Sequence, residues 1–113
     1  MNRKERAMLK HFLVKRGDQL SFTITFSAAF NPTALQMGVK KHYTDEVFTI
    51  IKSLGHGITK ISDTKYQFII DPTETKNLDI TDYVYDVQMK IGSVVKTPLS
   101  GKLMIKETTF ETE

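Results

Sequence analysis

Apolar and polar residues alternate along much of the chain from residue 20 onward. In LSFTITF, residues 20–26, every second side chain is apolar, and the alternation resumes in ALQMGVKK, residues 34–41. Successive side chains of a β-strand point to opposite faces, so a period of two places the apolar ones together. Both stretches are predicted to be strands with one buried face.

Residues 57–70 show the pattern of a hairpin. GITKI and KYQFII flank the turn-forming triplet SDT, and the second stretch places Tyr66, Phe68 and Ile70 on one face. The preceding stretch, HYTDEVFTIIKSLGHG, fits a strand around residues 48–51 and a short helix from Thr44 about equally well. Both alternatives stay open for that segment.

A short helix is predicted after the second strand of this hairpin. In DPTETKNL, Asp71 is placed to cap a helix, Pro72 suits its first position, and Glu74 follows the cap by three residues. One or two helical turns within residues 71–78 should follow.

The best-patterned part of the chain is TDYVYDVQMKIGSVVKTPLSGKLMI, residues 81–105. We interpret it as a hairpin in which Gly92 and Ser93 form the tight turn, with Gly101 in the returning strand before Leu103 and Ile105. The first strand carries its core face on five residues, Tyr83, Tyr85, Val87, Met89 and Ile91.

An earlier apolar segment, HFLV, is closed by Gly17 and Asp18, a turn-forming pair. It is predicted to be an edge strand that forms a hairpin with the strand beginning at Leu20. Arg16, Gly17 and Asp18 also spell the tripeptide that integrins recognise, but a turn requires Gly and Asp here in any case. We interpret the tripeptide as part of the turn.

The elements add up to about seven strands and one short helical turn, with turn signals roughly every ten residues. The predicted fold class is therefore all-β and mostly antiparallel, an immunoglobulin-like β-sandwich. In such domains a tyrosine near a strand start folds its hydroxyl back onto the preceding loop. Tyr83 is the candidate for that corner, and Tyr85 then stands where an immunoglobulin domain carries its second cysteine. The alternative, that both are ordinary strand tyrosines, stays open.

Length and composition bound the remaining possibilities. The 113 residues are 40% hydrophobic and 26% charged, which is typical of one globular domain. No apolar run approaches the roughly 18 residues that a membrane span needs, and the first residues lack the pattern of a signal peptide. The absence of cysteine excludes a disulfide framework and fits synthesis in a reducing cytoplasm.

The net charge of +3 is concentrated at the N-terminus, where residues 1–16 carry six basic residues against one acidic residue. We predict a flexible basic arm over residues 1–11, a single sandwich domain over 12–108 and a short tail over 109–113. The arm residues that could contact nucleic acid or an acidic partner are Arg3, Lys4, Arg6 and Lys10. A solvated, flexible terminus is the favoured interpretation.

No arrangement of residues indicates catalysis, a cofactor or a metal. His11, His42 and His56 lack the spacing of metal ligands. The carboxylates of Asp79, Asp82 and Asp86 are close in sequence but form no calcium-binding loop. The sequence predicts a protein that is not an enzyme.

Nucleotide and nucleic-acid binding are also disfavoured. The GHG of residues 55–57 lacks the remainder of a phosphate-binding loop. Tyr83 and Tyr85 share their face with aliphatic residues, as in a core, rather than with the basic residues of a base-stacking surface.

Three stretches resemble small β-sandwich proteins of tailed bacteriophages and prophages, in particular the N-terminal domain of upper baseplate proteins. They are FLVKRGDQLSFTITF, GITKISDTKYQFIIDPTETKNL and YVYDVQMKIGSVVKTPLSGKLMI. The resemblance covers roughly residues 12–108. Its most telling part is YDVQ, residues 85–88, followed by a glycine turn, a threonine and the Ser100–Gly101 pair.

The resemblance implies a non-enzymatic virion protein, a structural or accessory subunit of tail, baseplate or head. Its partners would be other virion proteins, with homo-oligomer formation expected, and it would be made in the host bacterial cytoplasm and located in the virion. An intracellular regulatory module that contacts protein or nucleic acid through the basic arm is the alternative. A sandwich enzyme or carbohydrate-binding domain is disfavoured, because the chain lacks the tryptophan on which sugar-binding platforms usually depend.

Overall fold

Strands dominate the computed structural model, which describes residues 8–27 and 31–109. Strands contain 59% of these residues and helix 5%. The strands are β1 (Met8–Leu9), β2 (Phe12–Lys15), β3 (Leu20–Thr25), β4 (Ala34–Lys40), β5 (Ile50–Leu54), β6 (Gly57–Lys60), β7 (Lys65–Ile70), β8 (Asp82–Ile91) and β9 (Val94–Lys106), and the helix is α1 (Pro72–Lys76). The predicted all-β class with one short helix is confirmed.

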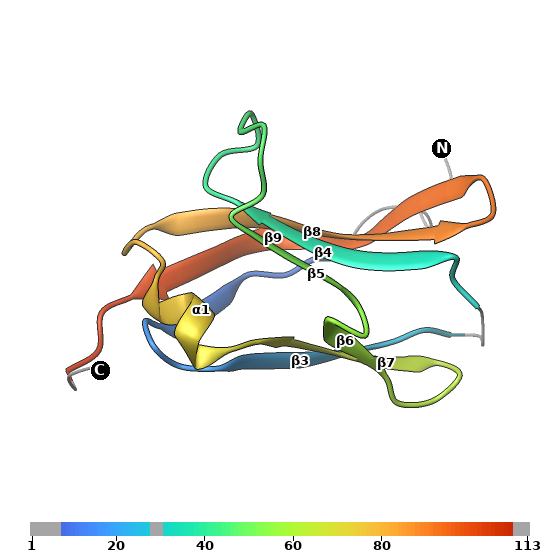
Figure 1. The fold of residues 1–113 in the computed structure, drawn as a ribbon, viewed down its shortest axis with the longest axis horizontal. Coiled ribbons are helices and arrows are strands. Elements are labelled where there is room, and N and C mark those ends of the chain that lie inside the picture. Colours follow the sequence, from blue (N-terminus) through green and yellow to red (C-terminus); the bar gives the residue numbers. More distant parts are fainter. Residues whose placement is uncertain (1–7, 28–30, 110–113) are drawn as a thin grey trace.

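The strands form two facing layers (Figure 1). One layer has the order β9-β8-β4-β5, with antiparallel neighbours, and β1 and β2 lie parallel to β9 at its edge. The other has the antiparallel order β6-β7-β3. A short pairing of β5 with β6 carries the chain between the layers. These neighbours match those of an immunoglobulin-like sandwich, so the predicted fold class is confirmed.

The core lies between the layers and is built from the predicted alternating faces. Leu35, Met37 and Val39 of β4 are buried, as are Tyr66, Phe68 and Ile70 of β7. Tyr83, Tyr85 and Val87 of β8 and Leu99, Leu103 and Ile105 of β9 are buried as well, beside the β4 residues and opposite those of β7. The prediction for Ile91 is wrong: it lies beside the hairpin turn, beyond the buried part of β8, and is 42% exposed.

The predicted hairpin of the first segment with β3 is also wrong. β2 pairs parallel with β9, and β3 pairs with β7 in the other layer. The turn at Gly17, with φ +93°, therefore carries the chain from one layer to the other. Buried Thr75 holds this turn: its hydroxyl accepts from Gly17 N–H at 3.1 Å and lies 2.7 Å from the carbonyl oxygen of Asp18, to which it can donate.

The sandwich begins earlier than residue 12. Met8 and Leu9 pair with β9, and Lys10 N–H donates to the Ser100 carbonyl oxygen at 2.9 Å. Residues 8–11 are therefore part of the domain rather than of a flexible arm. The correction has a physical reason, because these residues satisfy the backbone groups on the outer edge of β9.

The helix prediction is confirmed. Pro72 begins α1, and Asp71 N–H donates to Glu74 Oε1 at 3.0 Å, the reciprocal contact of a capping box. In the segment left open between strand and helix, β5 covers Ile50–Leu54, and residues 41–49 form a loop without helix.

Candidate protein-contact face

Tyr83 makes the backbone contact expected of a tyrosine corner. Its hydroxyl oxygen accepts a hydrogen bond from Asp79 N–H at 2.9 Å, while its ring lies in the core. The contact joins the start of β8 to the loop that follows α1. Its effect is to fix the loop that leads into β8.

Tyr85 lies two residues after Tyr83, on the same face of β8, and is also buried. Its hydroxyl donates to the Lys10 carbonyl oxygen at 2.7 Å, and its ring centroid lies 5.5 Å from that of Phe12. Burial raises the pKa of Tyr85 well above 10, and the Asp86 carboxylate adds to the rise. Tyr85 therefore serves as a neutral hydrogen-bond donor inside the sandwich.

The two glycines singled out from the sequence have different roles. Gly92, with φ +60°, begins the two-residue turn between β8 and β9, and its N–H donates to Thr33 Oγ1 at 2.9 Å. Gly101 lies against the backbone of Lys10, and a side chain there would collide with the Lys10 carbonyl. Both glycines therefore have structural roles.

The candidate arm residues fall into two groups. Arg3, Lys4 and Arg6 lie outside the described residues. Lys10 belongs to the sandwich through its backbone, and its ammonium lies 5.7 Å from the centroid of the Phe12 ring.

The histidines and carboxylates considered as chemical groups lie apart. His11 lies in the link between β1 and β2, and its Nδ1 accepts a hydrogen bond from Lys102 N–H of β9 at 3.0 Å. Asp79 pairs with Lys41 at 2.9 Å. Across residues 8–27 and 31–109, no three His, Cys, Asp or Glu side chains group closely enough to hold a metal ion. In the same residues no helix has the length and apolar character needed to cross a bilayer.

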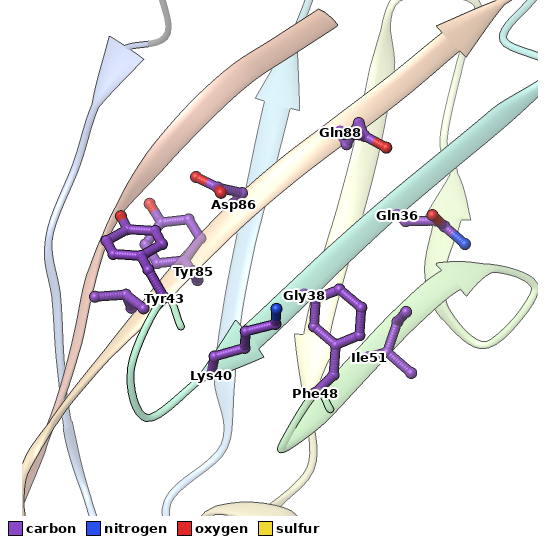
Figure 2. A pocket seen from close by; sticks show the side chains of 10 residues that line it. Gln36, Gly38, Lys40, Tyr43, Phe48, Ile51, Tyr85, Asp86 and Gln88 are labelled. Carbon is purple, nitrogen blue, oxygen red and sulfur yellow. The ribbon is translucent and has the colours of Figure 1, made fainter. Parts of the chain in front are cut away.

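A shallow hollow of about 250 Å³ lies on the outer surface of β4, β5 and β8 (Figure 2). Gly38 lies at its floor: it is between Ile51 of β5 and Asp86 of β8, its partners in the two neighbouring strands, and it has no side chain. We call this surface the β4–β8 face and define it by eight residues: Gln36, Gly38, Lys40, Tyr43, Phe48, Ile51, Asp86 and Gln88.

Phe48 packs flat against the backbone of β4 because Gly38 has no side chain. A Cβ at Gly38 would collide with the Phe48 ring. The Lys40 ammonium lies 4.9 Å from the centroid of the same ring and donates to the Asp45 carbonyl oxygen at 2.7 Å. Figure 2 shows the ring between Lys40 and Ile51. These contacts hold the loop of residues 41–49 against the sheet.

Large apolar side chains remain exposed on this face. Tyr43 is 62% exposed, and Phe48 and Ile51 are each 50% exposed. Exposed aromatic and apolar residues gathered in one patch are typical of a protein-contact surface, whereas single ones are ordinary. Because Tyr43, Phe48 and Ile51 gather around one hollow, the β4–β8 face is the candidate protein-contact surface.

Asp86 is the acidic residue of the β4–β8 face. It keeps contact with solvent, but burial by the surrounding chain removes enough water to raise the pKa of its carboxyl above 3.8. No ion-pair partner for this carboxylate lies among the described residues. A positive group brought by a partner would stabilise its charge.

The sequence predicted the strands β4 and β8 that carry this face, but it did not predict the group of exposed side chains on it. The outward positions of β4 read Gln36, Gly38 and Lys40, so the missing side chain at Gly38 was the available signal. What fills the place is Phe48, from the segment whose structure the sequence left open.

Comparison with known proteins gives little beyond this geometry. No family model matches the sequence, and no curated protein matches it. Among solved structures, the first Ig-like domain of the human CD48 antigen is similar to this chain. It has 13% sequence identity and a TM-score of 0.40, and the match covers 96% of this chain and 90% of that one.

Proposed function

We propose that this protein is a non-enzymatic subunit that acts through protein–protein contacts, with the β4–β8 face as its contact surface. The observation that carries the proposal is the placement of Tyr43, Phe48 and Ile51, all exposed, around the hollow beside Asp86. Aromatic residues are enriched at the centres of interfaces, and a few of them supply most of the binding energy.

The chemistry of the face indicates what a partner should bring. The Asp86 carboxylate has no ion-pair partner among the described residues, so a partner guanidinium or ammonium could pair with it. The Tyr43 and Phe48 rings offer apolar contact and a surface on which a guanidinium can stack. The partner surface we propose is therefore apolar with a basic residue near its centre.

The proposed setting is the particle of a tailed bacteriophage. Support comes from the resemblance of the three quoted stretches to baseplate proteins. In this setting the chain is made in the host cytoplasm, binds other virion proteins and acts as a homo-oligomer.

The test uses purified particles of the phage or prophage that carries this gene. We expect mass spectrometry to detect the chain in particles, and cross-linking to place the β4–β8 face against another structural protein. Tyr43→Ala and Asp86→Arg should each weaken that association by about tenfold or more. Ile61→Ala is the matched control, since Ile61 is an exposed apolar residue at the end of β6, in the other layer.

Salt separates this proposal from the regulatory alternative. An apolar contact should persist at about 0.5 M salt, where exposed charges are screened within a few ångströms. A monomer that is absent from particles, binds DNA at low salt and releases it at about 0.5 M would overturn the proposal.

A further inference from the structure

β3 is an edge strand of the second layer. Among the described strands it pairs with β7 alone, from Leu20 opposite Ile70 to Thr25 opposite Lys65. Phe26 N–H donates to the Thr64 carbonyl oxygen at 2.8 Å. In an antiparallel pair, hydrogen-bonded and non-hydrogen-bonded positions alternate, so the even-numbered residues of β3 bond to β7. The N–H and C=O groups of Ser21, Thr23 and Thr25 therefore point to the open edge.

The sequence of β3 itself, residues 20–25, lacks the features that usually prevent strand addition. Protein edges are commonly protected by charged side chains, proline, bulges or short length. β3 has six residues, LSFTIT, without charge or proline, and its register with β7 is regular. Its composition is rich in β-branched and aromatic residues, which favour strand pairing.

An apolar hollow of about 520 Å³ lies beside the same edge, between β3 and the start of β9. Phe22 and Ile24 of β3 line one wall, and Met89 and Leu99 line another. The rings of Phe12 and Phe22 also line it and stack with their centroids 4.6 Å apart.

Thr23 and Thr25 also line this hollow. The open peptide groups of β3 and the apolar cavity are therefore parts of one site. A strand added at this edge would form backbone hydrogen bonds to Thr23 and Thr25 and direct alternate side chains into the cavity.

The charged residues that line the hollow are both basic. Lys10 and Lys96 contribute to its wall, and among the described lining residues there is no carboxylate. An occupant that carries a carboxylate complements the Lys10 ammonium. A second copy presenting its own β3 would bring no charge, and residues 1–7, MNRKERA, carry three basic residues against one acidic residue.

We propose that the β3 edge accepts an extended segment of a partner protein as an added strand. The segment carries apolar side chains at alternate positions, which fill the hollow, and a carboxylate that lies near Lys10. The β3 edge belongs to the layer opposite the β4–β8 face, and the two hollows share no lining residue, so the proposal is tested independently of the proposed function.

The test measures binding of synthetic peptides to the full chain by amide NMR. The probe is a capped peptide of six residues, the length of β3, in which valine alternates with threonine and glutamate occupies one end. We expect the amide signals of Thr23 and Thr25 to shift and to become protected from hydrogen exchange. Replacing the glutamate by lysine should weaken binding by about threefold or more, because the partner charge near Lys10 becomes repulsive. A peptide methylated on alternate backbone nitrogens should not bind, since it cannot donate to the edge.

Two variants of β3 test the same claim from the protein side. Thr23→Pro removes an outward N–H and should weaken binding by about tenfold, the equivalent of one lost hydrogen bond. Thr23→Val keeps that N–H and should bind within about twofold of the unaltered chain. If Thr23→Pro does not fold, the methylated peptide still decides the question.

Three outcomes would overturn the proposal. One is binding that does not need the peptide's backbone donors, seen as equal binding of the methylated peptide or as saturation of the same signals by a fatty acid alone. Either result would make the hollow a site for small apolar ligands. Another is a concentration-dependent change of the Thr23 and Thr25 signals without peptide, which would indicate a second copy at the edge. The third is the absence of any shift at millimolar peptide.

Discussion

The hydroxyl of Tyr85 donates a 2.7 Å hydrogen bond to the carbonyl oxygen of Lys10, which lies 75 residues earlier in the chain. The bond joins β8 to the link between β1 and β2, across β9. Gly101, opposite Tyr85 in the β8–β9 pairing, leaves the space in which the Lys10 carbonyl lies. The N-terminal strands are therefore held to the sandwich from two neighbouring strands.

Tyr85→Phe should destabilise the domain by about 1–3 kcal/mol, because it leaves the Lys10 carbonyl without its donor. Chemical denaturation followed by circular dichroism measures the change. Tyr43→Phe is the matched control, since the Tyr43 side chain is exposed, and it should change stability by less than about 0.5 kcal/mol. Equal effects of the two variants would contradict the role given to the Tyr85 hydroxyl.

The same residue should make the domain sensitive to alkaline pH. Burial raises the folded-state pKa of Tyr85 above its ordinary value of 10, so the unfolded chain loses the proton first. The contribution of Tyr85 is fully present below pH 10 and is lost as pH rises from 10 toward the folded-state pKa. Denaturation between pH 9 and pH 11 should show a shallower loss of stability in Tyr85→Phe than in the unaltered chain. Parallel curves of stability against pH for the two proteins would show that the Tyr85 hydroxyl has the same pKa in the folded and unfolded states.

Gly101→Ala should detach the N-terminal strands, since the added methyl group would collide with the Lys10 carbonyl. We expect a loss of roughly 1–3 kcal/mol, as for other overpacked sites. The specific readout is hydrogen exchange of the Lys10 amide, which is bonded to the Ser100 carbonyl oxygen and should lose protection. Gly92→Ala is the control: its φ of +60° is strained for alanine, but its methyl group would meet open space, so Lys10 should stay protected.

The fold was predictable where the pattern is local. A period of two in LSFTITF or YVYDV is enough to assign the buried face of a strand, because side chains of a strand alternate whatever its neighbours are. The capping residues around Asp71 likewise act within one turn of chain.

Strand partners were not predictable in the same way. The turn at Gly17 fits a hairpin equally well, and only the open edge of β9 and buried Thr75 explain why β2 pairs elsewhere. The candidate contact face was missed for a related reason. The pattern around Phe48 fits a strand and a helix equally well, whereas Phe48 lies in a loop, and its place over Gly38 depends on how that loop folds back.

Glu74 joins two elements, and its two roles can be separated. Its carboxylate accepts from Asp71 N–H at the start of α1 and also pairs with Lys52 of β5. Glu74→Gln keeps an acceptor for the cap but removes the charge of the pair, whereas Glu74→Ala removes both. We expect Glu74→Ala to cost about 1 kcal/mol more than Glu74→Gln, the usual value of a helix cap. Thermal denaturation of the two variants, with Glu46→Ala as the exposed control, measures the difference.

Asp79 and Asp86 should respond to acid in opposite directions. Hydrogen bonding to Lys41 and its charge hold the pKa of Asp79 below 3.8, whereas burial raises the pKa of Asp86 above 3.8. The Asp79 contribution to stability is present above pH 3.8 and is lost as pH falls through its folded-state pKa. The Asp86 contribution is present below pH 3.8 and is lost as pH rises through its folded-state pKa.

Carbon-13 NMR titration of the two side-chain carboxyl groups tests this order directly. Lys41→Met should return the pKa of Asp79 toward 3.8 and leave that of Asp86 unchanged, because Lys41 contributes to the first shift and burial causes the second. Stability curves should agree: on acidification, the unaltered chain should lose stability relative to Asp79→Asn and gain it relative to Asp86→Asn. A pKa of Asp86 at or below 3.8 would contradict a net penalty on its charge from burial. A basic partner on the β4–β8 face would then have less to gain by pairing with it.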